Sequence, residues 1–174
     1  MEIRLERDGD DVVEVHRVAF GGEGDKVAGL VEALRRDDPE SLSLVAEVDG
    51  RVVGNVMFTR SLLDAPQRLV DVLVLSPLAV LPDHQRTGVG KALVRRGLEI
   101  ADEKGAPLVF LEGDPAYYSK SGFQAGIDLG FRKPSLRIPD PGFQVYPLSA
   151  YESWMTGTLV YSAAFWEHDC VGLR

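Results

Sequence analysis

The sequence predicts a mixed α/β fold, with one sheet and flanking helices. Three observations favour it: apolar, β-branched runs alternate with segments of helical periodicity, turn residues separate them, and the run 69–80 has too little polarity for an edge strand. The expected order is strand, helices, several strands, helix, strand, short helix and further strands. That order is typical of an α/β (in some schemes α+β) sheet.

The first forty residues predict a short strand and two helices. Ile3 and Leu5 alternate with charged residues, which favours a strand. Aspartates within 8–11 can cap the helix that follows, and Gly21-Gly22 ends it. A second helix is expected from Asp25 to Arg36, where apolar residues share one face.

The middle of the chain predicts the main strands. Leu42–Val48 and Arg51–Phe58 are apolar runs separated by Asp49-Gly50, a strong hairpin signal. Leu69–Val80 is a third run and is expected at the centre of the sheet. Later helices are expected at 88–104 (with Gly105 as its C-terminal cap) and 115–120, and later strands at 108–111, 143–146 and 158–165.

Composition narrows the class of protein. The 174 residues suit one domain, and 45% hydrophobic with 26% charged residues is ordinary for a soluble globular protein. No apolar run is long enough to span a membrane, and the charged N-terminus lacks the centre of a secretory signal, so the cytoplasm is expected. The single cysteine, Cys170, excludes an internal disulfide, and the three scattered histidines give no metal-ligand spacing.

The negative charge lies in the first part of the chain. Residues 1–50 hold 14 acidic and 6 basic side chains, whereas the remainder is balanced. An acidic surface repels phosphate backbones, which argues against nucleic-acid binding. Two interpretations remain open for this surplus: solubility, or attraction of a cationic substrate.

The segment after the central run has the features of an anion site. The run stops near Pro82, a polar turn follows, and Gly88 and Gly90 open a helix whose first N–H groups are exposed. Basic residues, among them Arg86 and Lys91, surround this helix start without an acidic neighbour. The alternative is that the glycines only permit a tight turn. The pattern is neither a Walker phosphate loop nor a dinucleotide fingerprint.

With these residues the chain resembles the GNAT N-acetyltransferase superfamily, whose signature is Gln/Arg-x-x-Gly-x-Gly/Ala. Here it is Gln85-x-x-Gly88-x-Gly90. A second element agrees, because Tyr118 stands shortly before the pair Gly122-Phe123. The string 113–118, with 50–54 upstream, looks like the YhbS-type subgroup of predicted acetyltransferases. The resemblance covers roughly residues 1–130 of a single domain spanning 1–174, and the strand-rich part 131–174 is less similar.

The resemblance implies a twisted, mostly antiparallel mixed sheet whose fourth and fifth strands splay apart around the pantetheine arm of acetyl-CoA. Leu69–Val80 would be the fourth strand and Leu108–Leu111 the fifth. Main-chain groups would hold the coenzyme, which is a co-substrate used without a metal. The implied cofactor-binding residues are Leu78, Ala79, Val80, Gln85, Arg86, Thr87, Gly88, Val89, Gly90 and Lys91.

The resemblance also implies direct acetyl transfer to a primary amine, with Tyr118 as the proton donor to the departing thiolate. A phenol is protonated at neutral pH and acidic enough for this task. The alternative is that Tyr117 and Tyr118 only pack as aromatic residues. For the base, Glu112, Asp114 and His84 are candidates, beside a water chain; the first two could instead cap a helix.

The acceptor is not identified by the sequence. A small molecule is the expected acceptor, and a protein N-terminus or lysine is the first alternative. A non-catalytic acyl-CoA sensor is the second alternative. No nucleic acid or membrane partner is expected, and the oligomeric state stays open, since the C-terminal part could pair across a two-fold axis in a homodimer.

Overall fold

A computed structural model describes residues 1–172 of the chain, which form two compact units. The first unit consists of Met1–Thr59 and Leu75–Glu99, and the second of Arg60–Val74 and the chain from Ile100 onwards. Three elements run through both units: β3 (Arg51–Asp64), β4 (Leu69–Val80) and α3 (Val89–Glu103).

The strands of the first unit follow the order β1-β2-β3-β4. β1 (Glu2–Leu5) pairs antiparallel with β2 (Leu42–Val48), and β2 pairs antiparallel with β3. Asp49 and Gly50 join β2 to β3 with φ angles of 50° and 76°. Two successive left-handed residues make the turn whose twist matches that of the flanking strands, so the predicted hairpin is confirmed.

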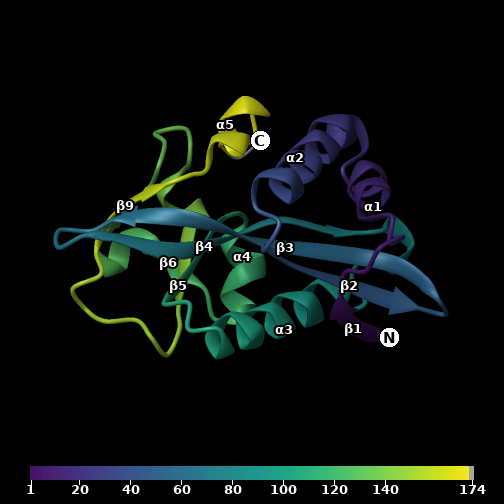
Figure 1. Cartoon of the computed structure of the whole chain (residues 1–174), viewed down its shortest axis with the longest axis horizontal. Coiled ribbons are helices and arrows are strands. Elements are labelled where there is room, and N and C mark those ends of the chain that lie inside the picture. The colour runs from purple at the N-terminus through teal and green to yellow at the C-terminus, as the bar shows by residue number, and fades with distance from the viewer. Residues whose placement is uncertain (173–174) are drawn as a thin grey trace. The chain divides into compact units, whose positions relative to one another are not determined.

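Helices cover both faces of the strands in the first unit (Figure 1). α1 (Val12–Ala19) packs against α2 (Gly24–Asp37) on one face, and α3 lies on the other. Successive residues of β3 point to opposite faces. A Cβ on Gly54 would lie 3.1 Å from side chains of α3, whereas the side chain of Asn55 bonds to His16 of α1 at 2.8 Å.

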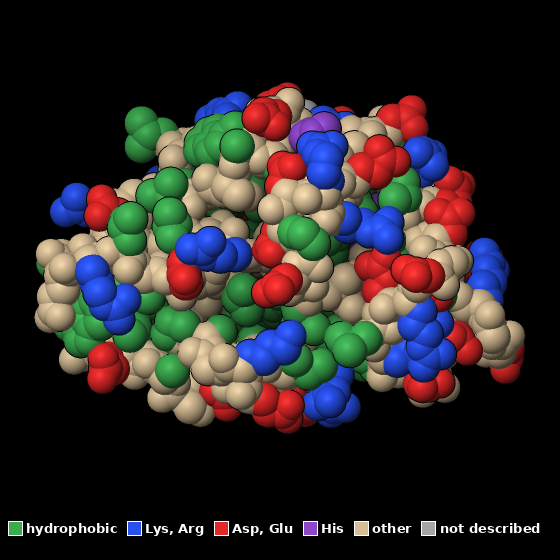
Figure 2. Space-filling model, in the orientation of Figure 1, with side chains coloured by type: hydrophobic (Ala, Val, Ile, Leu, Met, Phe, Trp, Pro, Cys, Tyr) green, Lys and Arg blue, Asp and Glu red, His purple; other side chains and the backbone are tan. Residues whose placement is uncertain are grey.

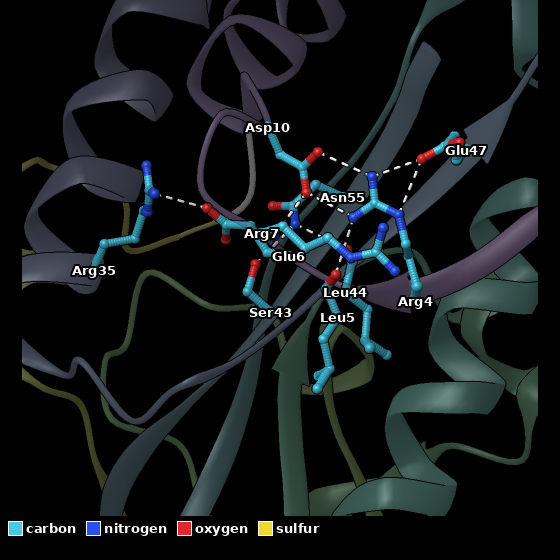
Figure 3. Close-up of polar contacts among 10 residues, drawn as sticks. All are labelled: Arg4, Leu5, Glu6, Arg7, Asp10, Arg35, Ser43, Leu44, Glu47 and Asn55. Carbon is cyan, nitrogen blue, oxygen red and sulfur yellow. Dashed lines mark hydrogen bonds and ion pairs between the residues drawn. The ribbon is translucent and has the colours of Figure 1, made fainter. Parts of the chain in front are cut away.

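Arg4 joins β1 to β2 and to the loop before α1 (Figure 3). Its guanidinium donates to both carboxylate oxygens of Asp10, at 2.7 and 2.9 Å, and to Glu47 Oε2 at 2.6 and 3.0 Å. The hydrogen bonds from Arg4 lower the pKa of Asp10 below its ordinary value. Close by, Glu6 pairs with Arg35 of α2 at 2.7 Å. Part of the N-terminal acidic surplus is therefore structural.

Acidic and basic side chains are interspersed over α1 and α2, at the upper right of Figure 2. Arg17 shows the pattern, because it pairs with Glu14 at 2.6 Å and with Asp25 at 3.1 Å on the surface. Exposed pairs of this kind contribute little to stability but keep a surface well hydrated. This arrangement favours the solubility interpretation of the acidic residues.

The second unit is built on two strand ladders. In the first, β4 pairs in parallel with β5 (Leu108–Glu112), and β5 pairs antiparallel with β8 (Phe143–Pro147), which pairs with β6 (Gln124–Ala125). In the second, the end of β3 pairs antiparallel with β9 (Gly157–Val160), which pairs in parallel with β7 (Phe131–Arg132). Antiparallel pairs predominate, as predicted for this fold class.

The parallel ladder between β4 and β5 is short. Its register positions are Leu73 opposite Val109 and Val74 opposite Phe110. β4 nevertheless continues to Val80. The predicted separation of the fourth and fifth strands is consistent with a ladder that ends this early.

Aromatic side chains fill the core of the second unit. Phe110 is fully buried; its ring lies edge-on to Phe131 at 5.0 Å and stacks on Phe143 at 5.7 Å between centroids. Such contacts add to the stabilisation from burial alone. Two short helices complete the unit: α4 (Pro115–Tyr118) and α5 (Ala163–Glu167).

Two sequence-based boundaries were wrong. The expected strand 158–165 ends at Val160, because its pairing with β3 stops there, and α5 follows. Phe165 of α5 packs against Tyr161, with ring centroids 5.0 Å apart. β3 extends beyond the expected Phe58 to Asp64, because Leu62–Asp64 find partners in β9. Within residues 1–172, none of the helices combines the length and apolar character that crossing a membrane requires.

Candidate functional site

The polar turn after β4 in the first unit is held by its own side chains. A 3-10 turn, Pro82–His84, follows the strand. Gln85 Nε2 then donates to the carbonyl of Val80 at 2.9 Å, and Thr87 Oγ1 donates to the carbonyl of His84 at 2.6 Å. These two hydrogen bonds hold the turn in its conformation.

The backbone of this turn has two left-handed residues. Arg86 has φ +61° and Gly88 has φ +90°. No atom lies within 4 Å of a Cβ built on Gly88, so conformation, and not space, makes glycine the suitable residue there. Arg86 adopts a conformation that costs a non-glycine residue about 1–2 kcal/mol. Such strain is found more often at binding sites than elsewhere.

The N-terminus of α3 presents main-chain N–H groups. The first hydrogen bond of the helix runs from Ala92 N to Gly88 O at 3.0 Å, so Val89, Gly90 and Lys91 come before it. The N–H groups of a first turn have no partner inside the helix, and the helix dipole favours an anion beside them. No acidic residue lies in this turn. The arrangement can bind a phosphate or diphosphate.

Val89 anchors this helix start, since its side chain is 3% exposed. Arg86 and Lys91 are exposed, and within residues 1–172 neither forms an ion pair. Their charges are therefore available to an anionic ligand. Of the β4 residues that sequence reasoning assigned to the coenzyme, Ala79 is buried, and Leu78 and Val80 are half-buried.

The second unit holds Tyr118, at the end of α4. Asp114 caps this helix by accepting from Ala116 N at 2.9 Å. Asp114 was a candidate for the base, and helix capping was the alternative expected for it. The Tyr118 ring lies edge-on to Tyr117 at 4.8 Å and to Phe123 at 5.9 Å. Burial, with a smaller contribution from Tyr117, raises the pKa of Tyr118 above its ordinary value, so the phenol is protonated at neutral pH.

Glu112, another base candidate, has partners on both carboxylate oxygens. Tyr161 donates to Oε2 at 3.0 Å, and Gly172 N donates to Oε1 at 2.8 Å. Burial raises the pKa of Glu112, although these hydrogen bonds and the charge of Arg137 act in the opposite direction. No local pattern in the sequence indicates this cluster, because the partners lie 49 and 60 residues further along the chain.

Two of the three histidines, among them the base candidate His84, lie in the first unit. His84 is half-buried in the 3-10 turn. His16 is fully buried, and its Nε2 lies 2.8 Å from Asn55 Oδ1. In the described part of the chain, no three side chains of His, Cys, Asp or Glu come together in a way that could hold a metal ion.

A cavity of about 410 Å³ lies in the first unit, between the start of α1 and the β2–β3 turn. Asp10, Asp11 and Glu14 are among its lining residues. These carboxylates have partners in the chain: Asp10 binds Arg4, Asp11 caps α1, and Glu14 pairs with Arg17. The cavity is therefore less negative than its composition alone indicates.

Comparison with known proteins decides the family. The profile described as "Acetyltransferase (GNAT) domain" matches residues 4–126, which include both the Gln85–Gly90 turn and Tyr118. This chain belongs to the GNAT acetyltransferase family. It is an acyltransferase by family, and the fold class and family expected from the sequence are confirmed.

Two curated relatives come from Escherichia coli (strain K12). The chain is 38% identical over 131 residues to the uncharacterized N-acetyltransferase YjhQ, and this match covers 73% of this chain and 71% of YjhQ. It is also 38% identical over 130 residues to the uncharacterized N-acetyltransferase YhbS, and this match covers 73% of this chain and 75% of YhbS.

Solved structures extend the similarity over most of the chain. The Escherichia coli YhbS structure, a complex with CoA, has a TM-score of 0.82 at 31% identity and covers 94% of this chain and 91% of that one. A GNAT family acetyltransferase from Brucella melitensis, in complex with acetyl-CoA, has a TM-score of 0.74 at 32% identity. This match covers 94% of this chain and 97% of that one. The C-terminal part, which the family profile does not reach, thus has counterparts in these two structures.

Proposed function

We propose that the protein transfers the acetyl group of acetyl-CoA to the primary amine of a small-molecule acceptor. The observation that carries the proposal is the start of α3, where main-chain N–H groups precede the first helical hydrogen bond and the first helical turn holds no acidic residue. The two similar structures that contain CoA or acetyl-CoA support the same coenzyme here.

In this proposal the diphosphate of the coenzyme binds the main chain from Arg86 to Lys91. Gly88 supplies the left-handed conformation that the turn requires, and the hydrogen bonds of the Gln85 and Thr87 side chains hold the turn in place. A preformed turn loses little conformational entropy on binding, which favours affinity. The side chains of Arg86 and Lys91 add positive charge.

The pantetheine arm and the acetyl group bind the main chain of Leu78, Ala79 and Val80. These residues follow Val74, at which the ladder between β4 and β5 ends. A main-chain N–H is a fixed donor, so it can stabilise the developing oxyanion without reorganising during the reaction.

The reaction proceeds by direct attack. The neutral amine nitrogen forms a bond to the carbonyl carbon, and the carbon–sulfur bond then breaks. The nitrogen releases its second proton to water to give the neutral amide, and the CoA thiolate takes a proton from the hydroxyl of Tyr118. The amine first loses its ammonium proton to a chain of water molecules, since Glu112 and Asp114 have structural partners. The raised pKa of Tyr118 keeps the donor protonated, and water from the solvent afterwards restores its proton.

The test is a free-thiol release assay with acetyl-CoA against amines, amino acids, polyamines and peptides. We expect release with small amines. Activity on peptides alone would instead indicate a protein N-terminal or lysine acetyltransferase. Coenzyme binding without thiol release on any amine would indicate a sensor, and would refute the proposed reaction.

The Tyr118→Phe variant tests the proton donor. We expect kcat to fall by about 10²-fold, because one general acid contributes at least that much, while the Kd for acetyl-CoA stays within a few fold. Tyr117→Phe is the matched control, because it removes the same hydroxyl from the adjacent, more exposed ring. Equal rates for the two variants would remove Tyr118 from this role.

A further inference from the structure

The corner between β5 and α4 in the second unit, residues Glu112, Gly113 and Asp114, is held from distant parts of the chain. Tyr161 and Gly172, both C-terminal to β9, each donate to one carboxylate oxygen of Glu112. A carboxylate that is half-buried and engaged on both oxygens is fixed in direction. The Glu112 side chain therefore links the C-terminal segment to the end of β5.

The next residue in the corner is fixed through its main chain. Gly113 N donates to the carbonyl of Gly142 at 3.0 Å. The carbonyl of Gly113 accepts from Gln144 Nε2 at 3.1 Å, and Gln144 is only 2% exposed. Because a buried amide that loses its partner is costly, these bonds resist movement of the peptide. The corner is thus fastened on both sides by β8 and the turn before it.

Tyr118 rests against this corner. A Cβ on Gly113 would lie 2.6 Å from the Tyr118 ring, so the ring packs directly on the glycine. Tyr118 N donates to the carbonyl of Asp114 at 3.1 Å, and Tyr118 O accepts from Phe123 N at 3.3 Å. Within the described residues, the phenol hydroxyl of Tyr118 has no hydrogen-bond partner. The direction of the phenol is consequently set by the corner and by the neighbouring rings.

We propose that Glu112 is a positioning residue that holds Tyr118 in place by fastening the corner to the C-terminal segment. The inference rests on the proposed role of Tyr118 as proton donor. Loss of the carboxylate would leave the Tyr161 hydroxyl and the Gly172 N–H without their acceptor. Only the bonds of Gly113 to Gly142 and Gln144 would then hold the corner, which would allow a small shift beneath the ring. Displacements near 1 Å can reduce a rate by about 10²-fold, so a partial shift has a measurable effect.

The role as positioning residue differs in its consequences from a role as general base. A glutamine at 112 keeps an oxygen to accept from Gly172 N, and its amide can donate to the Tyr161 oxygen, so it preserves the corner. It cannot accept a proton from an ammonium group. Positioning therefore predicts that Glu112→Gln retains most of the rate that Glu112→Ala loses, whereas a base predicts that both are slow.

The experiment is a double-mutant cycle between positions 112 and 118, measured as kcat and as the Kd for acetyl-CoA. We expect Glu112→Ala to lower kcat about tenfold with an unchanged Kd, and Glu112→Gln to stay within about threefold of the wild type. In the Tyr118→Phe background, Glu112→Ala should lower kcat less than about twofold. The matched control is Glu167→Ala, the same change at an exposed position of α5.

Three results would overturn the inference: equally slow alanine and glutamine variants, wild-type kcat in Glu112→Ala, or the full tenfold effect in the Tyr118→Phe background. A Tyr118→Phe enzyme at the wild-type rate is a separate result, because it refutes the proton donor itself. If Glu112→Ala does not fold, Tyr161→Phe replaces it, since it removes only the hydroxyl. We then expect about a threefold loss of kcat that disappears in the Tyr118→Phe background.

Discussion

Replacing Gly88 with alanine tests whether the left-handed turn before α3 is needed to bind the coenzyme. The added methyl group meets no atom within 4 Å, so its effect comes from the φ angle of +90° alone. That conformation costs an L-residue about 1–2 kcal/mol. Because Gly88 is exposed, we expect the free turn to relax, and the cost then appears on binding as an affinity about five- to thirtyfold weaker.

The assay is isothermal titration with CoA, together with urea unfolding. The control is Gly105→Ala at the other end of α3, where φ is +82° and no atom lies within 4 Å. Gly105 is also exposed, so its turn can relax in the same way. Because it lies outside the proposed binding turn, this variant should bind CoA normally. A Gly88→Ala affinity within twofold of the wild type would refute the reasoning.

Two further predictions concern stability. Gly97→Ala places a Cβ against the Phe58 ring with no room for it, and we expect a loss of about 1–3 kcal/mol in urea unfolding. The control is Gly22→Ala, where no atom lies within 4 Å, and equal effects of the two variants would contradict the packing argument. Burial lowers the pKa of His16 to about 4, so the unfolded chain binds a proton more readily between pH 6.5 and 4. The free energy of unfolding should therefore fall as pH decreases through this window, by up to about 3 kcal/mol; an equally steep decrease in His16→Gln would assign it to other groups.

The elements with strong local signals were predicted from the sequence. The run Leu69–Val80 forms a strand with the expected bounds, and Asp49-Gly50 forms the expected turn. Asp11 caps α1 by accepting from Glu14 N, as the aspartates before that helix indicated. In each instance the residues that determine the structure lie within a few positions of one another.

The elements that depend on distant partners were not predicted. β6 and β7 have two residues each, and pairing with β8 and β9 defines them more than their own sequences do. The end of β3 likewise depends on β9. The tether of Glu112 to Tyr161 and Gly172 joins residues far apart in the chain, and periodicity carries no information about such contacts.

The candidate site was predicted in part. The turn 85–91 has the glycine-dependent backbone that its sequence indicated, but the side chains of Gln85 and Thr87 fold the turn. The main-chain contacts to the coenzyme and the role of Tyr118 stay predictions until they are tested. The same holds for the single domain, the cytoplasmic location and a homodimer.

The most direct test of the account is a titration of the isotopically labelled protein with CoA, followed through its main-chain amide resonances. We predict that the largest changes, saturating with the coenzyme, occur at the N–H groups from Arg86 to Lys91. CoA that binds to saturation while these amides stay unchanged would contradict the claim that the start of α3 holds the diphosphate.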